Sequence, residues 1–128
     1  MRHDVLSDVL TSIKNGDLYG KREAITPTSK LTKDVLLIIQ KHKYIGDFEY
    51  IEDGRGGKFR ITLLGRINGC GSIMPRYSVT KNEYVKFEKR YLPAVGVGLL
   101  IVTTSLGVIT HNEAKQKGTG GKLLAYIY

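Results

Sequence analysis

The sequence predicts an α+β fold built from two modules, and three patterns along its 128 residues carry that prediction. Apolar residues recur at helical spacing in the first half, next to strand-like runs. A Gly-rich segment, residues 65–71, interrupts the middle of the chain. After it, the continuously apolar run Val97 to Val102 predicts a buried strand. We therefore expect an N-terminal α/β module, residues 1–65, packed against a mainly β C-terminal module with short helices, residues 66–128.

The N-terminal module is predicted to run helix, strand, helix, strand, strand. Asp4 is a suitable N-cap for the first helix, and Asn15-Gly16 is predicted to end it. A short strand is expected over residues 22–26, before Pro27. The two helices are marked by apolar residues three or four apart: Leu6, Val9, Leu10 and Ile13 in the first, and Leu31, Val35, Ile38 and Ile39 in the second.

Two strands, residues 48–51 and 58–64, are predicted to close this module. Apolar and polar residues alternate in the second, so one of its faces should be buried and the other wet. Residues 53–57 between them predict a hairpin loop. The loop contains the letters of the GxxG motif with which KH domains clamp RNA between two helices, but its place between two strands argues against that motif.

The C-terminal module is predicted to open with extended chain over residues 72–79, interrupted by Pro75. Thr80 with Glu83 has the spacing of a capping box, which predicts a helix of about ten residues ending at Arg90. Thr110 with Glu113 predicts a second capped helix, with Gly118 as its stop. Residues 123–128 should form a final strand.

A polar segment, Thr103 to Gly107, follows the predicted buried strand. Its three adjacent hydroxyls cannot act as acids or bases at neutral pH, but they suit short hydrogen bonds to ribose, phosphate or base edges. The same residue types also occur in ordinary β-turns. The position between a buried strand and a capped helix favours RNA contact, because such a loop is already shaped before binding.

This order of elements resembles the small-subunit ribosomal protein S8 family. That family carries a Ser-Thr-Ser-x-Gly-Val loop, then Thr-x-x-Glu-Ala and a Gly-Gly turn before an apolar, aromatic-ended tail. The matching elements here are residues 103–108, residues 110–114 and Gly120-Gly121. Thr103 replaces a family serine and keeps the hydroxyl, whereas Leu106 stands where a polar or basic residue would add a contact. The segment Lys-Arg-Tyr-Leu-Pro at 89–93 looks like the archaeal-type branch.

The resemblance implies RNA contacts at Thr104 and Ser105, and residue types extend the candidate site. The first set of RNA-binding candidates is Thr103, Thr104, Ser105, Gly107, Gly120, Gly121, Lys122 and Tyr91. A second set is Ser29, Lys30, Arg55, Lys58, Arg76 and Arg90. In the aromatic and basic segment around Tyr91, Tyr84 is instead expected to pack in the core.

The charge distribution points to a polyanionic partner for the second half of the chain. The net charge is +8. Residues 1–64 hold 11 Lys and Arg against 9 Asp and Glu, whereas residues 65–128 hold 9 against 3. The first half therefore carries +2 and the second +6, and the excess lies with the hydroxyl segment.

Other classes of function find no support in the sequence. No apolar run is long enough to span a bilayer, and the absence of an apolar N-terminal segment together with a single cysteine, Cys70, predicts a reducing cytoplasm. His3, His42 and His111 lack metal-like spacing. The segment Gly118 to Leu123 fails as a phosphate-binding loop, because Leu123 stands where Ser or Thr would hold magnesium. We expect no catalysis, no cofactor and no small-molecule substrate.

The predicted function is that of a primary RNA-binding protein of the small ribosomal subunit. The resemblance implies that it docks on the central domain of the small-subunit ribosomal RNA and contacts neighbouring ribosomal proteins. A translational regulator that binds a messenger RNA mimic of that site is an alternative, since one surface would serve both. A protein–protein scaffold is a less favoured one, because internal periodicity accounts for the apolar residues.

Overall fold

The computed structural model describes residues 5–52, 54, 56–73, 76–94 and 96–128. Four helices and two antiparallel sheets occur among them, which confirms the predicted α+β class. Contacts divide the chain into two compact units, residues 1–68 (unit 1) and residues 69–128 (unit 2). The division falls inside the Gly-rich segment 65–71. Asp4, Arg55 and Pro75, to which the sequence assigned roles, lie outside the described residues.

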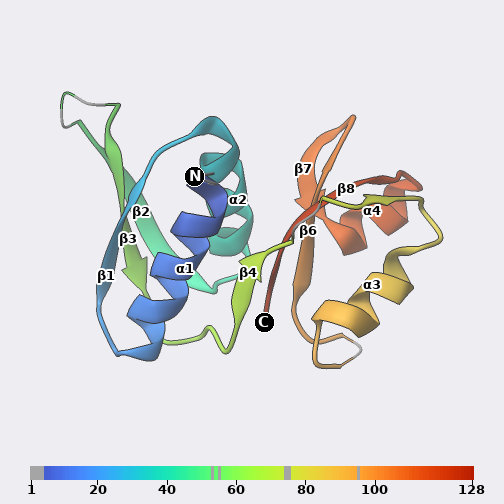
Figure 1. Cartoon of the computed structure of the whole chain (residues 1–128), viewed down its shortest axis with the longest axis horizontal. Coiled ribbons are helices and arrows are strands. Elements are labelled where there is room, and N and C mark those ends of the chain that lie inside the picture. The colour runs from blue at the N-terminus through green and yellow to red at the C-terminus, as the bar shows by residue number, and fades with distance from the viewer. Residues whose placement is uncertain (1–4, 53, 55, 74–75, 95) are drawn as a thin grey trace. The chain divides into compact units, whose positions relative to one another are not determined.

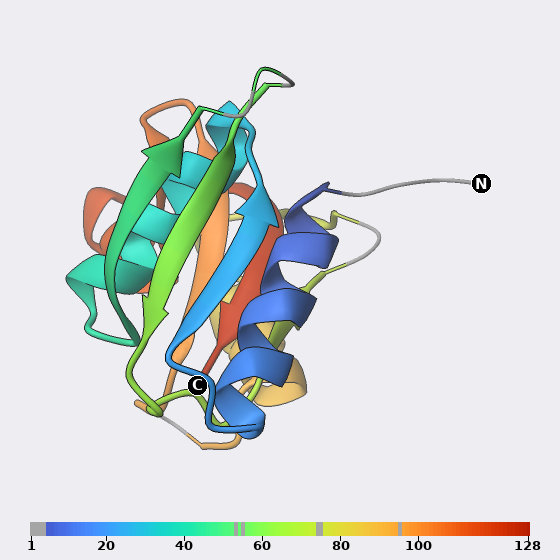
Figure 2. The ribbon, with the colours of Figure 1, turned by 90° about the vertical axis from the view of Figure 1, so that its left-hand side faces the viewer.

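Unit 1 is a three-stranded antiparallel sheet with two helices on one face (Figures 1 and 2). Strand β3 lies between β1 and β2, as Figure 2 shows. The order along the chain is the predicted helix, strand, helix, strand, strand. The elements are α1 (Val5–Leu18), β1 (Glu23–Pro27), α2 (Lys30–Lys41), β2 (Ile45–Ile51) and β3 (Lys58–Leu63).

The burial pattern of β3 confirms the predicted alternation. Phe59, Ile61 and Leu63 are buried, and the residues between them are exposed. Pro27 lies in β1, contrary to the expectation that the strand would end before it. Because β1 is an edge strand, a residue without an N–H costs the sheet no internal hydrogen bond there.

The predicted end of the first helix was wrong. The helix α1 continues through Asn15-Gly16 to Leu18. Gly16 is buried, and a Cβ added there would lie 2.7 Å from the Leu63 side chain, so this glycine permits close packing of the helix on the sheet. Gly20, with φ of +72°, takes the left-handed conformation that follows many helices.

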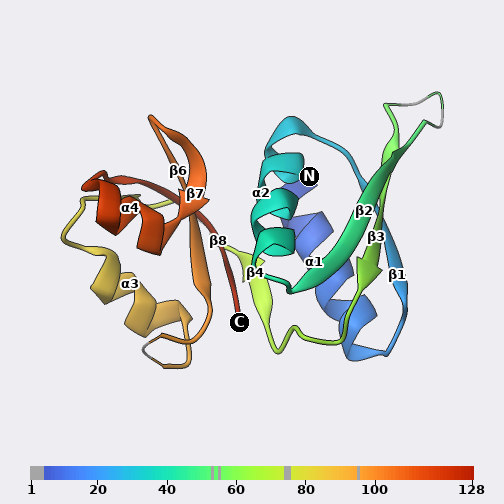
Figure 3. The ribbon, with the colours of Figure 1, turned by 180° about the vertical axis from the view of Figure 1, so that it is seen from behind.

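Unit 2 is a mainly β unit whose sheet has the order β4-β8-β6-β7, with β5 also paired to β8. Helices α3 and α4 complete it (Figures 1 and 3). The elements are β4 (Cys70–Ser72), β5 (Ser78–Val79), α3 (Tyr84–Tyr91), β6 (Leu99–Thr104), β7 (Gly107–Thr110), α4 (His111–Lys117) and β8 (Gly121–Ile127). Its core includes Ile73, Val79, Tyr84, Phe87, Leu92, Leu100, Val102, Ile109, Ala114 and Leu123.

The first predicted capping box was only half right. Helix α3 starts at Tyr84, three residues later than the box predicts, and Glu83 occupies the cap position without a side-chain cap bond. The Glu83 carboxylate does accept a hydrogen bond from the Thr80 backbone N–H at 3.1 Å, but residues 81–82 form a turn. Tyr84 and Phe87 are buried, so the predicted core role of Tyr84 is confirmed.

The predicted cap and start of the second helix are confirmed. The Thr110 hydroxyl accepts from the Glu113 backbone N–H at 3.2 Å, and α4 begins directly after it. Gly118 ends the helix with φ of +65°, the left-handed conformation expected of a C-terminal glycine.

Strand β6 lies two residues further along than predicted. Val97 is 45% exposed, and the strand begins at Leu99. Gly98 precedes it with φ of +84°, and a Cβ there would lie 2.6 Å from the Ile127 carbonyl oxygen. At its other end the strand continues through Thr103 and Thr104, which pair with β7.

Candidate nucleic-acid interface

The predicted polar loop is a tight β-hairpin joining β6 and β7. Thr103 pairs with Val108 and Thr104 with Gly107, which leaves a turn of only two residues, Ser105 and Leu106. The expectation that residues 103–107 form a loop was therefore wrong, because three of the five belong to strands. Gly107 has φ of +111°, which an L side chain rarely adopts, and this glycine allows the short connection. The hairpin tip extends beyond α3 and α4 (Figure 3).

The three hydroxyls of the hairpin are not equivalent. The Thr104 hydroxyl accepts from the Leu106 backbone N–H at 3.0 Å and donates to the Gly107 carbonyl at 3.0 Å. Its only proton is used inside the turn, and one acceptor site remains. Ser105 is exposed, and its hydroxyl makes no hydrogen bond within the described residues. Ser105 therefore presents an exposed hydroxyl that can both donate to and accept from a ligand, whereas Thr103 is half-buried.

The glycine pair lies beside the hairpin. Gly121 begins strand β8, so the predicted Gly-Gly turn ends one residue earlier than expected. A Cβ on Gly121 would lie 2.5 Å from the Thr103 carbonyl oxygen, and one on Gly120 would lie 2.5 Å from the Val79 carbonyl oxygen. Both glycines therefore serve close contact between backbones within unit 2.

Lys122 follows the glycines and supplies a charge next to the hairpin. It pairs with Thr103 across β6 and β8, and directly opposite residues of an antiparallel pair project from the same face. Lys122 is exposed and Thr103 half-buried. The strand register thus brings together the hydroxyl residues, the glycines and one lysine, seven members of the first candidate set.

Tyr91 and Arg90 lie on another part of unit 2. The Arg90 guanidinium carbon is 5.2 Å from the ring centre of Tyr77 and 5.5 Å from that of Tyr91, and its Nη2 donates to the Tyr77 hydroxyl at 3.4 Å. Contact with two rings restricts the exposed guanidinium. An arginine held in this way can bind phosphate at a small cost in side-chain entropy.

Tyr91 also belongs to a row of stacked tyrosines that sequence reasoning missed. Its ring centre is 5.6 Å from that of Tyr126, which is 6.2 Å from that of Tyr128. Because Tyr126 lies four positions after Lys122 in β8, roughly 13 Å of strand separates this row from the hairpin residues. Tyr126 and Tyr128 are two residues apart, so in a strand their side chains project from the same face. This spacing is the sequence signal that could have predicted the row.

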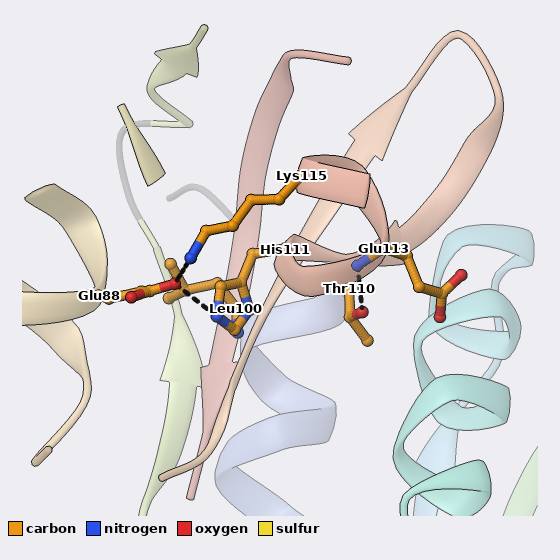
Figure 4. Close-up of polar contacts among 6 residues, drawn as sticks. All are labelled: Glu88, Leu100, Thr110, His111, Glu113 and Lys115. Carbon is orange, nitrogen blue, oxygen red and sulfur yellow. Dashed lines mark hydrogen bonds and ion pairs between the residues drawn. The ribbon is translucent and has the colours of Figure 1, made fainter. Parts of the chain in front are cut away.

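A buried polar network joins α3, α4 and β6, as Figure 4 shows. His111 Nδ1 accepts from the Leu100 backbone N–H at 3.0 Å, and Nε2 donates to the Glu88 carboxylate at 2.9 Å. Lys115 binds the same carboxylate oxygen. These partners fix a neutral imidazole with its proton on Nε2. Sequence reasoning missed this network, because His111 and Glu88 are far apart in the chain.

Burial lowers the pKa of His111, and the charge of Lys115 acts in the same direction. The Glu88 carboxylate opposes them and only partly offsets the effect. The net effect is a lowered pKa, so His111 is neutral at pH 7 and links α4 to α3 and β6 through hydrogen bonds.

The second candidate set is dispersed, and the two units divide it. Arg76 is exposed in unit 2. In unit 1, the Ser29 hydroxyl is the N-cap of α2 and accepts from the Thr32 backbone N–H at 3.1 Å. Lys30 is the first residue of α2, and Lys58 is exposed at the start of β3. Ser29 therefore has a structural role of its own.

Three further features of the described residues concern metal binding, the cysteine and membrane-spanning helices. Within it, no group of three His, Cys, Asp or Glu side chains is arranged to hold a metal ion. Cys70 is buried. Among the described helices, none is both long and apolar enough to cross a bilayer.

One comparison with known proteins accords with this geometry. Residues 4–128 match the family model described as ribosomal protein S8.

Proposed function

We propose, because this chain belongs to the ribosomal protein S8 family, that unit 2 docks on the central domain of the small-subunit ribosomal RNA and supports its folding during assembly. The family is one of structural ribosomal proteins and not of enzymes; it comprises small-subunit proteins that bind ribosomal RNA and have ribosomal protein partners. Membership of its archaeal-type branch is part of the proposal, and residues 89–93 support it.

The single observation that carries the proposal is the state of the Ser105 hydroxyl. It stands exposed on a two-residue turn whose shape is fixed by two hydrogen bonds of Thr104. A hydroxyl held in this way forms hydrogen bonds with RNA without the entropy cost of ordering a loop. Gly107 adds no side chain after the turn, whereas the Leu106 side chain is exposed on the turn beside Ser105.

Cations of unit 2 supply the second part of the mechanism. Lys122 stands beside the hairpin, and Arg90 is held by two tyrosine rings. Release of counterions on phosphate binding contributes affinity that does not depend on sequence. Hydrogen bonds from the hairpin then select an irregular RNA shape.

The experiment is co-sedimentation of the tagged protein with small ribosomal subunits in a lysate of the source cells. We expect the parent protein and Thr11→Ala to sediment with the subunit, and Ser105→Ala to be depleted from it. Thr11 is the matched control, because it is an exposed hydroxyl on α1 in the other unit. Absence of the parent protein from the small-subunit fraction would contradict the proposal.

A further inference from the structure

Unit 1 contains a cavity of about 490 Å³ that the hairpin site does not use. Its volume is within the range of sites that hold small organic groups. We refer to it as the aromatic pocket; it is lined by Thr28, Ser29, Lys30, Lys33, Phe48, Tyr50 and Phe59.

The walls of the aromatic pocket are ring systems from two paired strands. Tyr50 pairs with Phe59 across β2 and β3, so both side chains project from the same sheet face, and their ring centres are 6.4 Å apart. Phe48 lies two residues before Tyr50 and meets Phe59 edge-on, with ring centres 5.5 Å apart. Tyr50 is 53% exposed, so a ring of this wall is open to a ligand.

The position of the Tyr50 ring is held by the hairpin that follows it. A Cβ added to Gly57 would lie 2.2 Å from the ring, which shows how closely the ring packs on that glycine. Its hydroxyl lies 3.0 Å from the Glu52 carboxylate, to which it donates. Thr28, on the pocket lining, donates to the Gly56 carbonyl at 2.8 Å. The ring is therefore in place before any ligand arrives.

The charged residues that line the aromatic pocket are both lysines, and the Glu52 carboxylate bound to the Tyr50 hydroxyl lies outside this lining. Lys30 and Lys33 lie in the first turn of α2 and are both exposed. None of the described residues that line the pocket carries a carboxylate. The N-terminus of a helix carries a partial positive charge, which repels these two lysines. An anion bound between them would offset this repulsion.

We propose that the aromatic pocket binds one unpaired RNA nucleotide, its base against the Tyr50 ring and its phosphate at Lys30 and Lys33. Aromatic rings stack with any base, and lysine binds phosphate as a point charge. This second contact rests on the proposed function, because ribosomal RNA is the molecule that would supply the nucleotide. It gives unit 1 a part in RNA binding separate from that of the hairpin.

The test uses the full chain and a dodecamer of uridylate, which has no folded structure for the hairpin to recognise. Binding is followed by fluorescence anisotropy over a series of salt concentrations. Tyr50→Ala should weaken binding by roughly 5- to 150-fold, the range for loss of one stacked base. Tyr50→Phe keeps the ring and should bind like the parent.

Two lysines of α2, Lys33 and Lys41, provide a test variant and its matched control. Lys33→Ala should weaken binding. It should also reduce the magnitude of the slope of log affinity against log salt concentration (the salt slope) by about 0.7, the value for one phosphate contact on a single strand. Lys41→Ala removes an exposed lysine from the opposite end of α2 and should change neither quantity. Melting temperatures of all variants are measured beside the binding curves.

Two results of the dodecamer experiment would overturn this inference. One is parent-like binding by folded Tyr50→Ala and Lys33→Ala, and the other is an equal loss for Lys33→Ala and Lys41→Ala. Loss of subunit co-sedimentation in Tyr50→Ala with unchanged dodecamer binding would identify a protein contact and would likewise reject it. Ser105→Ala should bind the dodecamer like the parent, so failure of the aromatic pocket is distinguishable from failure of the hairpin site.

Discussion

The Thr104 hydroxyl accepts a hydrogen bond from the backbone N–H of Leu106, two residues further along the chain, at 3.0 Å. With the bond that Thr104 donates to Gly107, it closes the β6–β7 turn from inside. The turn therefore separates two roles that the sequence could not: Thr104 holds the shape, and Ser105 presents a hydroxyl.

This separation predicts different effects for two neighbouring hydroxyls. Thr104→Val keeps the side-chain shape but removes both turn bonds, so it should lower the free energy of unfolding by about 0.5–1.5 kcal/mol. Ser105→Ala should change that free energy by less than about 0.5 kcal/mol. Chemical denaturation of both variants measures the difference. Equal stability of the two would mean that Thr104 does not brace the turn.

Alanine substitutions in the two predicted capping boxes should differ in how much stability they cost. Thr110→Ala should cost about 0.5–2 kcal/mol of stability, because the Thr110 hydroxyl caps α4. Thr80→Ala should cost less than about 0.5 kcal/mol, because α3 begins at Tyr84 with Glu83 at its cap position, so the Thr80 hydroxyl caps no helix. Thermal melts of the pair provide the measurement. A larger loss for Thr80→Ala would reverse the assignment of caps.

His111 predicts loss of stability in weak acid. Its pKa lies below the ordinary 6.5 in the folded chain, because burial disfavours the charged form. As the pH falls below 6.5, the unfolded chain takes up a proton that the folded chain does not. The free energy of unfolding should therefore decrease by up to ~1.4 kcal/mol per pH unit, until the folded-state pKa is reached.

The control for this pH dependence is a pair of substitutions. In His111→Asn, denaturation between about pH 4.5 and 7.5, from roughly 2 units below to 1 unit above the ordinary pKa, should show a flatter dependence of stability on pH. His42→Asn changes an exposed histidine after α2 and should keep the parent curve. An unchanged curve in His111→Asn would exclude His111 as its source.

Unit 2 should carry most of the ribosomal RNA affinity. A fragment of residues 69–128 should fold by circular dichroism and keep a salt slope near 0.9 per phosphate, with roughly three to six phosphates bound. Filter binding of the fragment and of the full chain measures this. Dominant affinity in residues 1–68 would assign recognition to the other unit.

The sequence predicted the fold wherever one local signal decided the structure. The alternation around Ile61 and the Thr110 cap are of this kind, since each needs only neighbours in the chain. It misplaced boundaries where packing decides between two signals. Gly16 resembles a helix stop, but the Leu63 side chain needs its missing Cβ. Thr80 resembles a cap, but α3 starts later because Tyr84 and Phe87 are the residues that reach the core.

The candidate site was predictable in its residues and not in its geometry. The polar run after Val102 identified the hydroxyl segment, and strand pairing then placed Lys122 beside it. The division of labour between Thr104 and Ser105 depends on the turn type, which the sequence left open. The aromatic pocket required the register of β2 on β3, which brings Tyr50 opposite Phe59.

The most direct test of the central claim is the affinity of Ser105→Ala and Lys58→Ala for small-subunit ribosomal RNA at one fixed salt concentration. Ser105→Ala loses a hydrogen bond in a desolvated interface and should weaken binding by about 1–3 kcal/mol, or roughly 5- to 150-fold, with an unchanged melting temperature. Lys58, exposed at the start of β3 in the other unit, should have little effect when replaced. Parent-like binding by Ser105→Ala, together with a tenfold or greater loss for Lys58→Ala, would contradict the account and move the recognition surface to unit 1.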